Sequence, residues 1–158
     1  MKGLTARGVN TSVVRLPQVH DTRKQGLVPY LFAVAREKGV SAYIAGGSNR
    51  WPAAHVSDVA RLYRLAFEKA ESGAIYHAVD EEGVSMRAIA EAHARGLKVP
   101  VISITPEEAE AHFGWLARFA GHDMPSSSTL TQEKLNWKPT GPGLIAALDG
   151  MDNTNTQA

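Results

Sequence analysis

The chain has no cysteine among its 158 residues. Disulfide bonds, a thiolate zinc site and a cysteine nucleophile are therefore excluded. The histidines do not replace them as a metal site, because no two of the six stand three or four residues apart, as they would on one face of a helix. A Gly-x-Ser-x-Gly sequence is also absent, which argues against a serine hydrolase built on that turn.

Long hydrophobic runs and an excess of charge of one sign are missing as well. No apolar run approaches ~20 residues, so we expect no membrane-spanning helix. The first residues, from Met1 to Leu4, do not begin the apolar run of a signal peptide. The formal net charge is +1, with lysine and arginine scattered, so neither a nucleic acid nor a membrane surface is indicated as a partner. The lack of cysteine is compatible with a cytoplasmic protein, which is what we expect.

What the chain does have is an alternation of β-rich and helical stretches, which indicates an α/β fold. We expect one domain over residues 1–149 and a flexible tail over 150–158. Residues 2–8 are interpreted as a helix end, and residues 17–25 as a loop after a buried strand at 11–16. The other expected strands lie at 41–45, 74–79 and 99–104. The expected helices lie at 27–38, 57–70, 86–97 and 126–135, with further helix starts at 105 and 142.

One stretch, residues 50–61, predicts a loop, a strand of two or three residues and a helix start. Ser57 is predicted to cap the helix, and Asp58 would then lie in the first turn, where a negative charge suits the helix dipole. Residues at helical spacing predict one buried apolar face on this helix. They are Val59, Leu62, Tyr63, Ala66, Phe67 and Ala70.

Two other helix starts carry specific signals. Ser85 is predicted to cap the helix at 86–97. Thr105 and Glu108 form a capping-box pattern around Pro106, which stands at the first helical position.

Several motifs resemble, in the same order, the later part of the extended short-chain dehydrogenase/reductases, the NAD-dependent epimerase/dehydratase family. The motif Arg-x-x-x-x-His-Val-x-Asp-Val-Ala at residues 50–60 is similar to a signature of that family. Other similar segments are found at residues 15–20, 75–78, 85–91 and 135–140. The resemblance implies a partial Rossmann-type α/β fold of late strands and helices, with the small C-terminal substrate-binding subdomain.

The resemblance also implies a site. Pro17, Val19 and His20 would lie beside the nicotinamide, although an ordinary exit from a strand is an equal interpretation. Arg50 would bind a substrate anion, for which its bidentate guanidinium is suited, or would be a solvated surface arginine. Trp51 would line the substrate pocket or pack in the core. His55 is a substrate-side candidate, but for both His55 and Asp58 we favour a structural role.

Two motifs of the family are absent. No Gly-x-x-Gly-x-x-Gly loop is present to receive the cofactor pyrophosphate at a helix N-terminus. No tyrosine is followed four residues later by lysine, so the family's Tyr-x-x-x-Lys pair is missing and no catalytic residue is assigned. We therefore expect the C-terminal half of such an enzyme, inactive alone, whose intact relatives use NAD or NADP.

Three interpretations remain open from the sequence. The chain is the substrate-binding portion of an NAD(P)-dependent oxidoreductase or epimerase acting on a small molecule, completed by an N-terminal half. Alternatively, it is a non-catalytic module that binds a ligand or a partner. The third interpretation is a truncation product with exposed sheet edges, which would favour self-association into a homo-oligomer.

Overall fold

The computed structural model describes residues 8–151. The helix end expected at residues 2–8 and the tail expected at 150–158 therefore lie almost wholly outside the described residues. No helix within residues 8–151 has the length and apolar character needed to cross a membrane.

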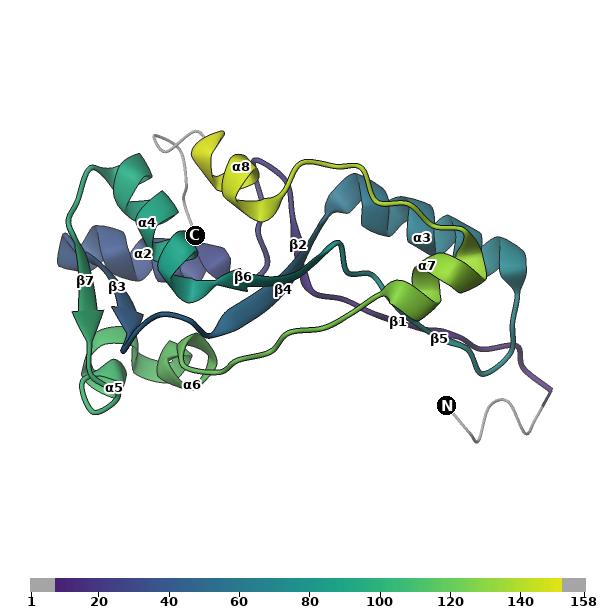
Figure 1. The fold of residues 1–158 in the computed structure, drawn as a ribbon, viewed down its shortest axis with the longest axis horizontal. Coiled ribbons are helices and arrows are strands. Elements are labelled where there is room, and N and C mark those ends of the chain that lie inside the picture. The colour runs from purple at the N-terminus through teal and green to yellow at the C-terminus, as the bar shows by residue number, and fades with distance from the viewer. Residues whose placement is uncertain (1–7, 152–158) are drawn as a thin grey trace.

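The chain folds into a mixed α/β structure with three small sheets arranged along its long axis (Figure 1). At one end, β1 (Val13–Arg15) pairs in parallel with β5 (Ile75–His77). At the other end, β3 (Ser41–Ile44) pairs in parallel with β7 (Val101–Ile104). The middle sheet has the order β2 (Gln18–His20), β4 (Arg50–His55) and β6 (Glu81–Ser85), in which β4 is parallel to β2 and antiparallel to β6.

Helices cover these sheets at both ends. The end that holds β3 and β7 carries α2 (Val28–Lys38), α4 (Met86–Leu97), α5 (Ala109–Phe113) and α6 (Ala117–Ala120), with a short 3-10 helix over Gly114–Leu116 (Figure 1). The opposite end carries α3 (Val56–Lys69) and α7 (Thr129–Leu135). The last helix, α8 (Leu144–Asp149), contacts α4 and β4.

Strand β4 joins two separate hydrophobic cores. Trp51 and Ala53 belong to the larger core under α2 and α4, whereas Ala54 belongs to the smaller core between α3, β5 and Trp137. The pairing of β4 with β6 is irregular between Trp51 and Ala53, on either side of Pro52, which cannot donate a ladder hydrogen bond. One strand therefore fixes the position of both ends of the molecule.

The predicted helices are present, and their end signals are largely confirmed. Gly39 ends α2 in the left-handed conformation, and the Ser85 hydroxyl accepts a hydrogen bond from Ala88 N at the start of α4. The capping box is formed in both directions, because Thr105 N donates to Glu108 Oε2 (2.8 Å) and Glu108 N donates to Thr105 Oγ1 (3.3 Å). The prediction of Pro106 as the first helical residue is wrong, because residues 106–108 form a turn and α5 begins at Ala109.

The strand predictions need correction. The strand expected at 11–16 has three residues and is half-exposed rather than buried. The predicted loop at 17–25 begins with strand β2, and β6 was not predicted. Strand β4 runs for six residues where two or three were expected. Short strands with polar residues owe their conformation to partners that lie far along the chain, so their own sequences carry a weak signal.

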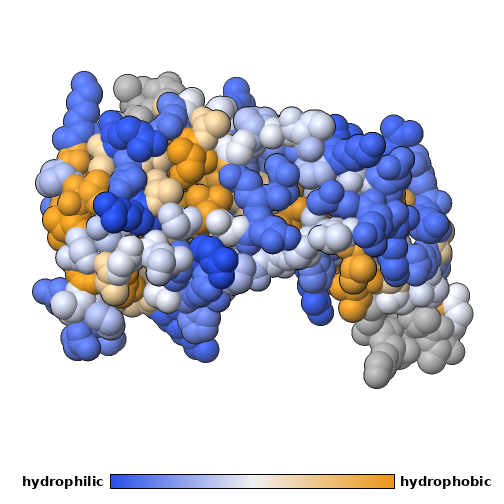
Figure 2. Space-filling model, viewed as in Figure 1, coloured by the Kyte–Doolittle hydropathy of each residue, from blue (hydrophilic) through white to orange (hydrophobic). Residues whose placement is uncertain are grey.

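Helix α3 differs from its prediction in two ways. The cap is His55, whose Nδ1 accepts from Ser57 N (3.3 Å), and not Ser57. Val59, Leu62 and Ala66 are buried as expected, but Tyr63 and Phe67 are exposed to 48% and 87%, and Ala70 is exposed as well. Figure 2 shows a largely hydrophilic surface on the face drawn, with apolar residues gathered over the end that holds α2 and α4 and in a small area beside α7.

Candidate functional site

Parallel pairing of β2 with β4 brings two predicted site residues together. Val19 lies opposite Ala54 and His20 opposite His55 in the register. The imidazole rings of His20 and His55 meet edge to face, with their centroids 5.7 Å apart. The carboxyl ends of both strands therefore place Val19, His20 and His55 at one edge of the middle sheet, the edge at which parallel α/β sheets commonly bind ligands.

A pocket of ≈ 660 Å³ opens at this edge. Its residues come from β2, from the loop that follows, from the first turn of α2 and from the start of α3. They are Val19, His20, Asp21, Arg23, Lys24, Gln25, Gly26, Pro29, Tyr30 and Val56. Both the volume and the largely apolar lining suit a small organic ligand.

His20 is a buried polar group on the wall of this pocket. Its side chain is fully buried, and neither ring nitrogen has a hydrogen-bond partner among the described residues. Burial, reinforced by the nearby His55, lowers the pKa of His20 to about 4. The imidazole is therefore neutral at pH 7 and carries one N–H donor and one acceptor nitrogen. The Glu81 carboxylate lies 4.0 Å from His20 Nε2.

The loop after β2 is held in a tight turn by Asp21. Its Oδ1 accepts from Arg23 N (2.6 Å) and Lys24 N (2.7 Å), and these bonds hold the pKa of Asp21 below its ordinary value. Gln25 is buried: its amide nitrogen donates to Asp21 O (2.8 Å), while its Oε1 has no partner among the described residues. The turn thus directs Arg23 and Lys24 to the exposed mouth of the pocket.

The structure does not bring the other predicted site residues to this pocket. Arg50 stands at the opposite end of β4, where Arg50 Nε and Nη2 bind the two oxygens of Asp123 at 3.0 and 2.9 Å. Hydrogen bonds from Arg50 hold the pKa of Asp123 below its usual range. Trp51 is fully buried, with its indole N–H donating to Phe119 O (3.2 Å). Pro17 precedes β2 and does not line the pocket.

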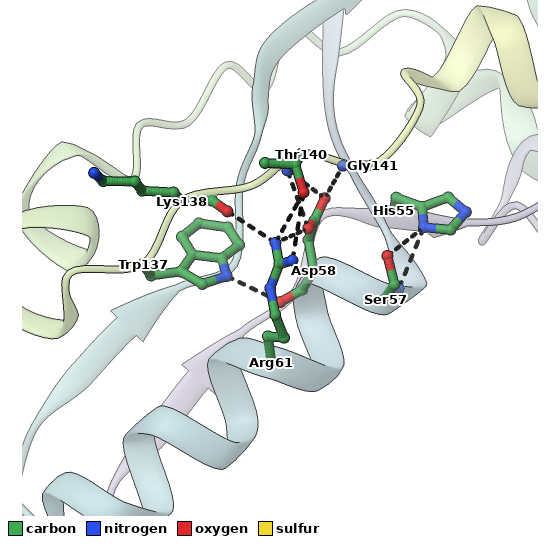
Figure 3. Close-up of polar contacts among 8 residues, drawn as sticks. All are labelled: His55, Ser57, Asp58, Arg61, Trp137, Lys138, Thr140 and Gly141. Carbon is green, nitrogen blue, oxygen red and sulfur yellow. Dashed lines mark hydrogen bonds and ion pairs between the residues drawn. The ribbon is translucent and has the colours of Figure 1, made fainter.

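Asp58 is a buried anchor between α3 and the segment after α7 (Figure 3). Its carboxylate accepts from Gly141 N (2.7 Å) and Thr140 N (3.1 and 3.2 Å), and it pairs with the Arg61 guanidinium. The Trp137 indole donates to Asp58 O (3.0 Å). These contacts join two motifs 80 residues apart in sequence and give Asp58 a structural role, as the sequence favoured.

Sequence reasoning missed part of the pocket. Gln25, Tyr30 and Val56 line it, but each lies in a segment that was interpreted only as loop or helix. Three consecutive polar residues, Arg23 to Gln25, just before a helix were the available signal. The geometry that turns them toward one opening depends on the pairing of β2 with β4.

A second pocket of ≈ 460 Å³ lies between the loop after β3 and the segment that holds α5 and α6. Its wall is formed mainly by the small residues of Ala45 to Asn49 with Pro106 and Ala117, and Glu110 is the one charged side chain there. It offers fewer polar groups to a ligand than the pocket beside His20.

The chain matches no protein-family model. It is 49% identical over 144 residues to an uncharacterized protein of Schizosaccharomyces pombe. This alignment covers 90% of the chain and 49% of the relative. An uncharacterized protein of Saccharomyces cerevisiae is 41% identical over 140 residues, with coverages of 88% and 47%. The chain therefore spans about half the length of these curated relatives.

Several solved structures with the same fold contain bound NAD. A dTDP-glucose 4,6-dehydratase of Streptomyces venezuelae with NAD bound aligns at a TM-score of 0.67 and 16% identity, covering 94% of this chain and 46% of that one. A UDP-glucose 4-epimerase of Thermus thermophilus in complex with NAD aligns at a TM-score of 0.65 and 18% identity. The alignment covers 92% of this chain and 46% of that one. A Silicibacter pomeroyi protein of unknown function aligns at a TM-score of 0.63 and 20% identity. The alignment covers 89% of this chain and 48% of that one. At these identities the similarity establishes the fold: the chain has the Rossmann-like α/β fold of about half of an epimerase or dehydratase chain.

Proposed function

We propose that this chain is the C-terminal, substrate-side portion of an NAD(P)-dependent oxidoreductase or epimerase of the extended short-chain dehydrogenase/reductase type. The observation that carries the proposal is that nearly the whole chain aligns with less than half of NAD-bound dehydratases and epimerases. In this proposal a second half supplies the cofactor loop and the tyrosine–lysine pair, and the chain alone is inactive.

The outer edge of β1 supports the proposal. Strand β1 pairs only with β5 among the strands of residues 8–151, so its other side presents unpaired backbone groups. Leu16, which follows β1, and Ile75 of the paired strand β5 are exposed to 54% and 46%. An open edge flanked by apolar side chains is a ready template for a further strand, and we propose that the second half supplies it.

An apolar stripe on α3 is a second support. Val56, Ala60, Tyr63 and Phe67 follow the spacing that places residues on one face of a helix, next to the face that Val59, Leu62 and Ala66 bury. All four are exposed, and together they run along a helix about 21 Å long. An apolar face that is wider than its buried part is typical of a helix with a further packing partner, and the described residues do not supply that partner.

The pocket beside His20 fits one part of a nicotinamide cofactor. A pocket with largely apolar walls, to which Val19, Pro29, Tyr30 and Val56 contribute, suits a flat ring. When bound, nicotinamide would supply hydride transfer to or from a substrate carbon. In this proposal Val19 and His20 orient the ring and Pro17 sets the exit of the chain from β1. The pyrophosphate and adenosine would bind to the other half, because the chain lacks the glycine loop.

The substrate-side residues keep distinct roles in the proposal. His55 does not line the pocket; it packs against the ring of His20, which does, and caps α3. Arg50 binds a substrate anion only if it leaves Asp123, and Trp51 supports the pocket from within the core. A non-catalytic binding module is the second candidate, favoured by the absence of any Tyr-x-x-x-Lys pair in this chain.

Co-expression with a complementing half tests the proposal. The partner is the portion of the Schizosaccharomyces pombe relative that the alignment leaves uncovered. We expect a 1:1 complex by size-exclusion chromatography with light scattering. The double variant Tyr63→Asp/Phe67→Asp should prevent the complex, because it buries charge in the interface. In the absence of the partner, the melting temperature of this variant should stay within about 2 °C of that of the native chain, because both residues are exposed.

Leu130→Asp is the matched control, because Leu130 is exposed to 73% on α7 and lies off the stripe. This variant should leave the complex intact. Failure to form any complex would contradict the proposal, as would a complex that survives the charges on α3 and is lost with Leu130→Asp.

A further inference from the structure

The start of β4 holds a distant segment of the chain through hydrogen bonds on both sides of an acidic residue. Asn49 Nδ2 donates to Ala120 O (2.8 Å), and Met124 N donates to Arg50 O (2.8 Å). Asp123 lies between these two bonded positions of the segment. Its carboxylate is therefore kept beside Arg50 by the fold itself, and not only by the attraction of the two charges.

Asp123 fills the hydrogen-bonding fork of Arg50. The Asp123 Oδ1 atom accepts from Arg50 N (2.7 Å) and Arg50 Nε (3.0 Å), and Oδ2 accepts from Arg50 Nη2 (2.9 Å). Gly83 of β6 lies against the stem of the same side chain, because a Cβ there would be 2.8 Å from Arg50 Cβ and 3.0 Å from Arg50 Cδ. The guanidinium is thus held between a bare stretch of strand and a carboxylate that it binds in the bidentate manner.

This ion pair stands beside the second pocket, the one of ≈ 460 Å³. Asn49 and Gly121 line that pocket, and each lies within two residues of one member of the pair. The charged side chain in the pocket wall is Glu110, which is acidic. An anion that entered here would meet two carboxylates and a guanidinium that is already paired.

An external anion would also compete with a group of the same chain. A tethered carboxylate acts at an effective concentration of about millimolar or above, so a free anion must bind the guanidinium much better than Asp123 does in order to displace it. Arg50 also holds the pKa of Asp123 below its usual range, so the carboxylate keeps its charge at neutral pH. The fork of Arg50 is therefore closed to a ligand of moderate affinity.

We propose that Asp123 is a specificity-determining residue, which occupies the fork of Arg50 in place of a substrate anion. The substrate then carries no phosphate or carboxylate at this position, and it presents an uncharged part of the molecule to the second pocket. Arg50 supports the rim of that pocket through Asp123 and does not itself bind the substrate. This inference rests on the proposed function only in making the excluded anion part of a substrate; the exclusion is a property of the chain alone.

Inorganic pyrophosphate tests the inference on the purified chain, with binding followed by phosphorus NMR. The native chain should show no saturable binding. Asp123→Asn removes the competing charge and keeps an oxygen that can accept from Arg50 N, so this variant should bind pyrophosphate about tenfold more tightly than the native chain. Arg50→Ala/Asp123→Asn should lose the gain, because the guanidinium is then absent.

Glu68→Gln is the matched control, because it frees Arg64 from an exposed ion pair of similar length (2.8 Å) that lines neither pocket. It should leave pyrophosphate binding as it is in the native chain. A second measurement needs no change at Asp123: the NMR signal of the Arg50 Nε–H group, assigned by its loss in Arg50→Ala, should not shift when pyrophosphate is added to the native chain.

Two results would overturn the inference. One is binding of pyrophosphate to the native chain with a shift of the Arg50 signal, because the fork would then be open to anions. The other is a folded Asp123→Asn variant that binds pyrophosphate no more tightly than the native chain. Neither result bears on formation of the complex proposed above, so the two proposals fail separately.

Discussion

Burial decides the charge of two histidines in this chain. His20 and His93 are both about 97% buried or more, and burial lowers the pKa of each to about 4. His93 packs edge to face against Phe32, with centroids 5.4 Å apart, in the core between α2 and α4. The two residues differ in surroundings: His93 lies in packed core, whereas His20 lines the pocket after β2.

These lowered pKa values predict acid sensitivity. An unfolded histidine binds a proton near pH 6.5, whereas His93 in the folded chain does so only near pH 4. The folded state is therefore stabilised above pH 6.5, and the free energy of unfolding falls as the pH drops from 6.5 toward 4. His93→Leu should reduce this fall by about 1 kcal/mol for each pH unit crossed. Urea denaturation at pH 7 and pH 4.5 measures it, and an unchanged pH dependence in the variant would contradict the account.

Asp58 is the residue whose loss should cost most stability outside the core. Asp58→Asn replaces a carboxylate oxygen by an amide donor that faces the N–H groups of Thr140 and Gly141, and it removes the ionic partner of Arg61. We expect a loss of about 3 kcal/mol in the free energy of unfolding by urea, with the m-value unchanged. Glu68→Gln is the control, because the Arg64–Glu68 pair is exposed and screened by solvent, so its loss should leave stability nearly unchanged. Equal losses in the two variants would refute the anchoring role of Asp58.

At the scale of elements, the turns make the next prediction. Gly39 and Gly47 have nearly the same left-handed φ, +66° and +64°. A Cβ at Gly39 would meet nothing within 4 Å, whereas at Gly47 it would lie 2.7 Å from both Arg87 Cβ and the Tyr43 ring. Gly39→Ala should thus cost about 1 kcal/mol from backbone strain alone, and Gly47→Ala at least twice as much. Thermal unfolding of the two variants tests this. An equal loss of stability in both would contradict the prediction, because it would mean that Arg87 and Tyr43 move away from the added methyl group without cost.

The helices were predictable because their signals are local. Gly39, Ser85 and the Thr105–Glu108 capping box act within one turn of chain. The structure places Gly39 and Ser85 as the sequence indicated, and it forms the capping box, although α5 begins three residues after Pro106. Strands β2 and β6 have no such signal. Gln18 to His20 are extended because Ala53 to His55 pair with them, more than 30 residues later.

The same distinction explains the site. Val19 and His20 were identified through a resemblance, and the β2–β4 register brings them to His55. Arg50 and Trp51 lie five and four residues before His55 in one strand, so an extended backbone carries them about 13–17 Å away from it. Sequence proximity on a strand therefore does not mean a shared pocket. Tyr30 and Gln25 escaped notice because their side chains become pocket walls only after the sheet forms.

At the scale of the whole molecule, the open edge of β1 and the apolar stripe on α3 lie at the same end of an elongated fold (Figure 1). The ligand pocket begins where that stripe does, since Val56 belongs to both. A second half that covered the stripe would stand next to the pocket. That placement would bring a cofactor held by the second half to the edge where His20 and His55 meet.

The most direct test of this account is the binding of NADH to the chain alone and to the reconstituted complex, followed by cofactor fluorescence. We predict that the chain alone gives no saturable binding, because it has no glycine loop for the pyrophosphate. The complex should bind about one NADH for each pair of halves. Saturable binding by the chain alone, equal to that of the complex, would contradict the division of the site between two halves.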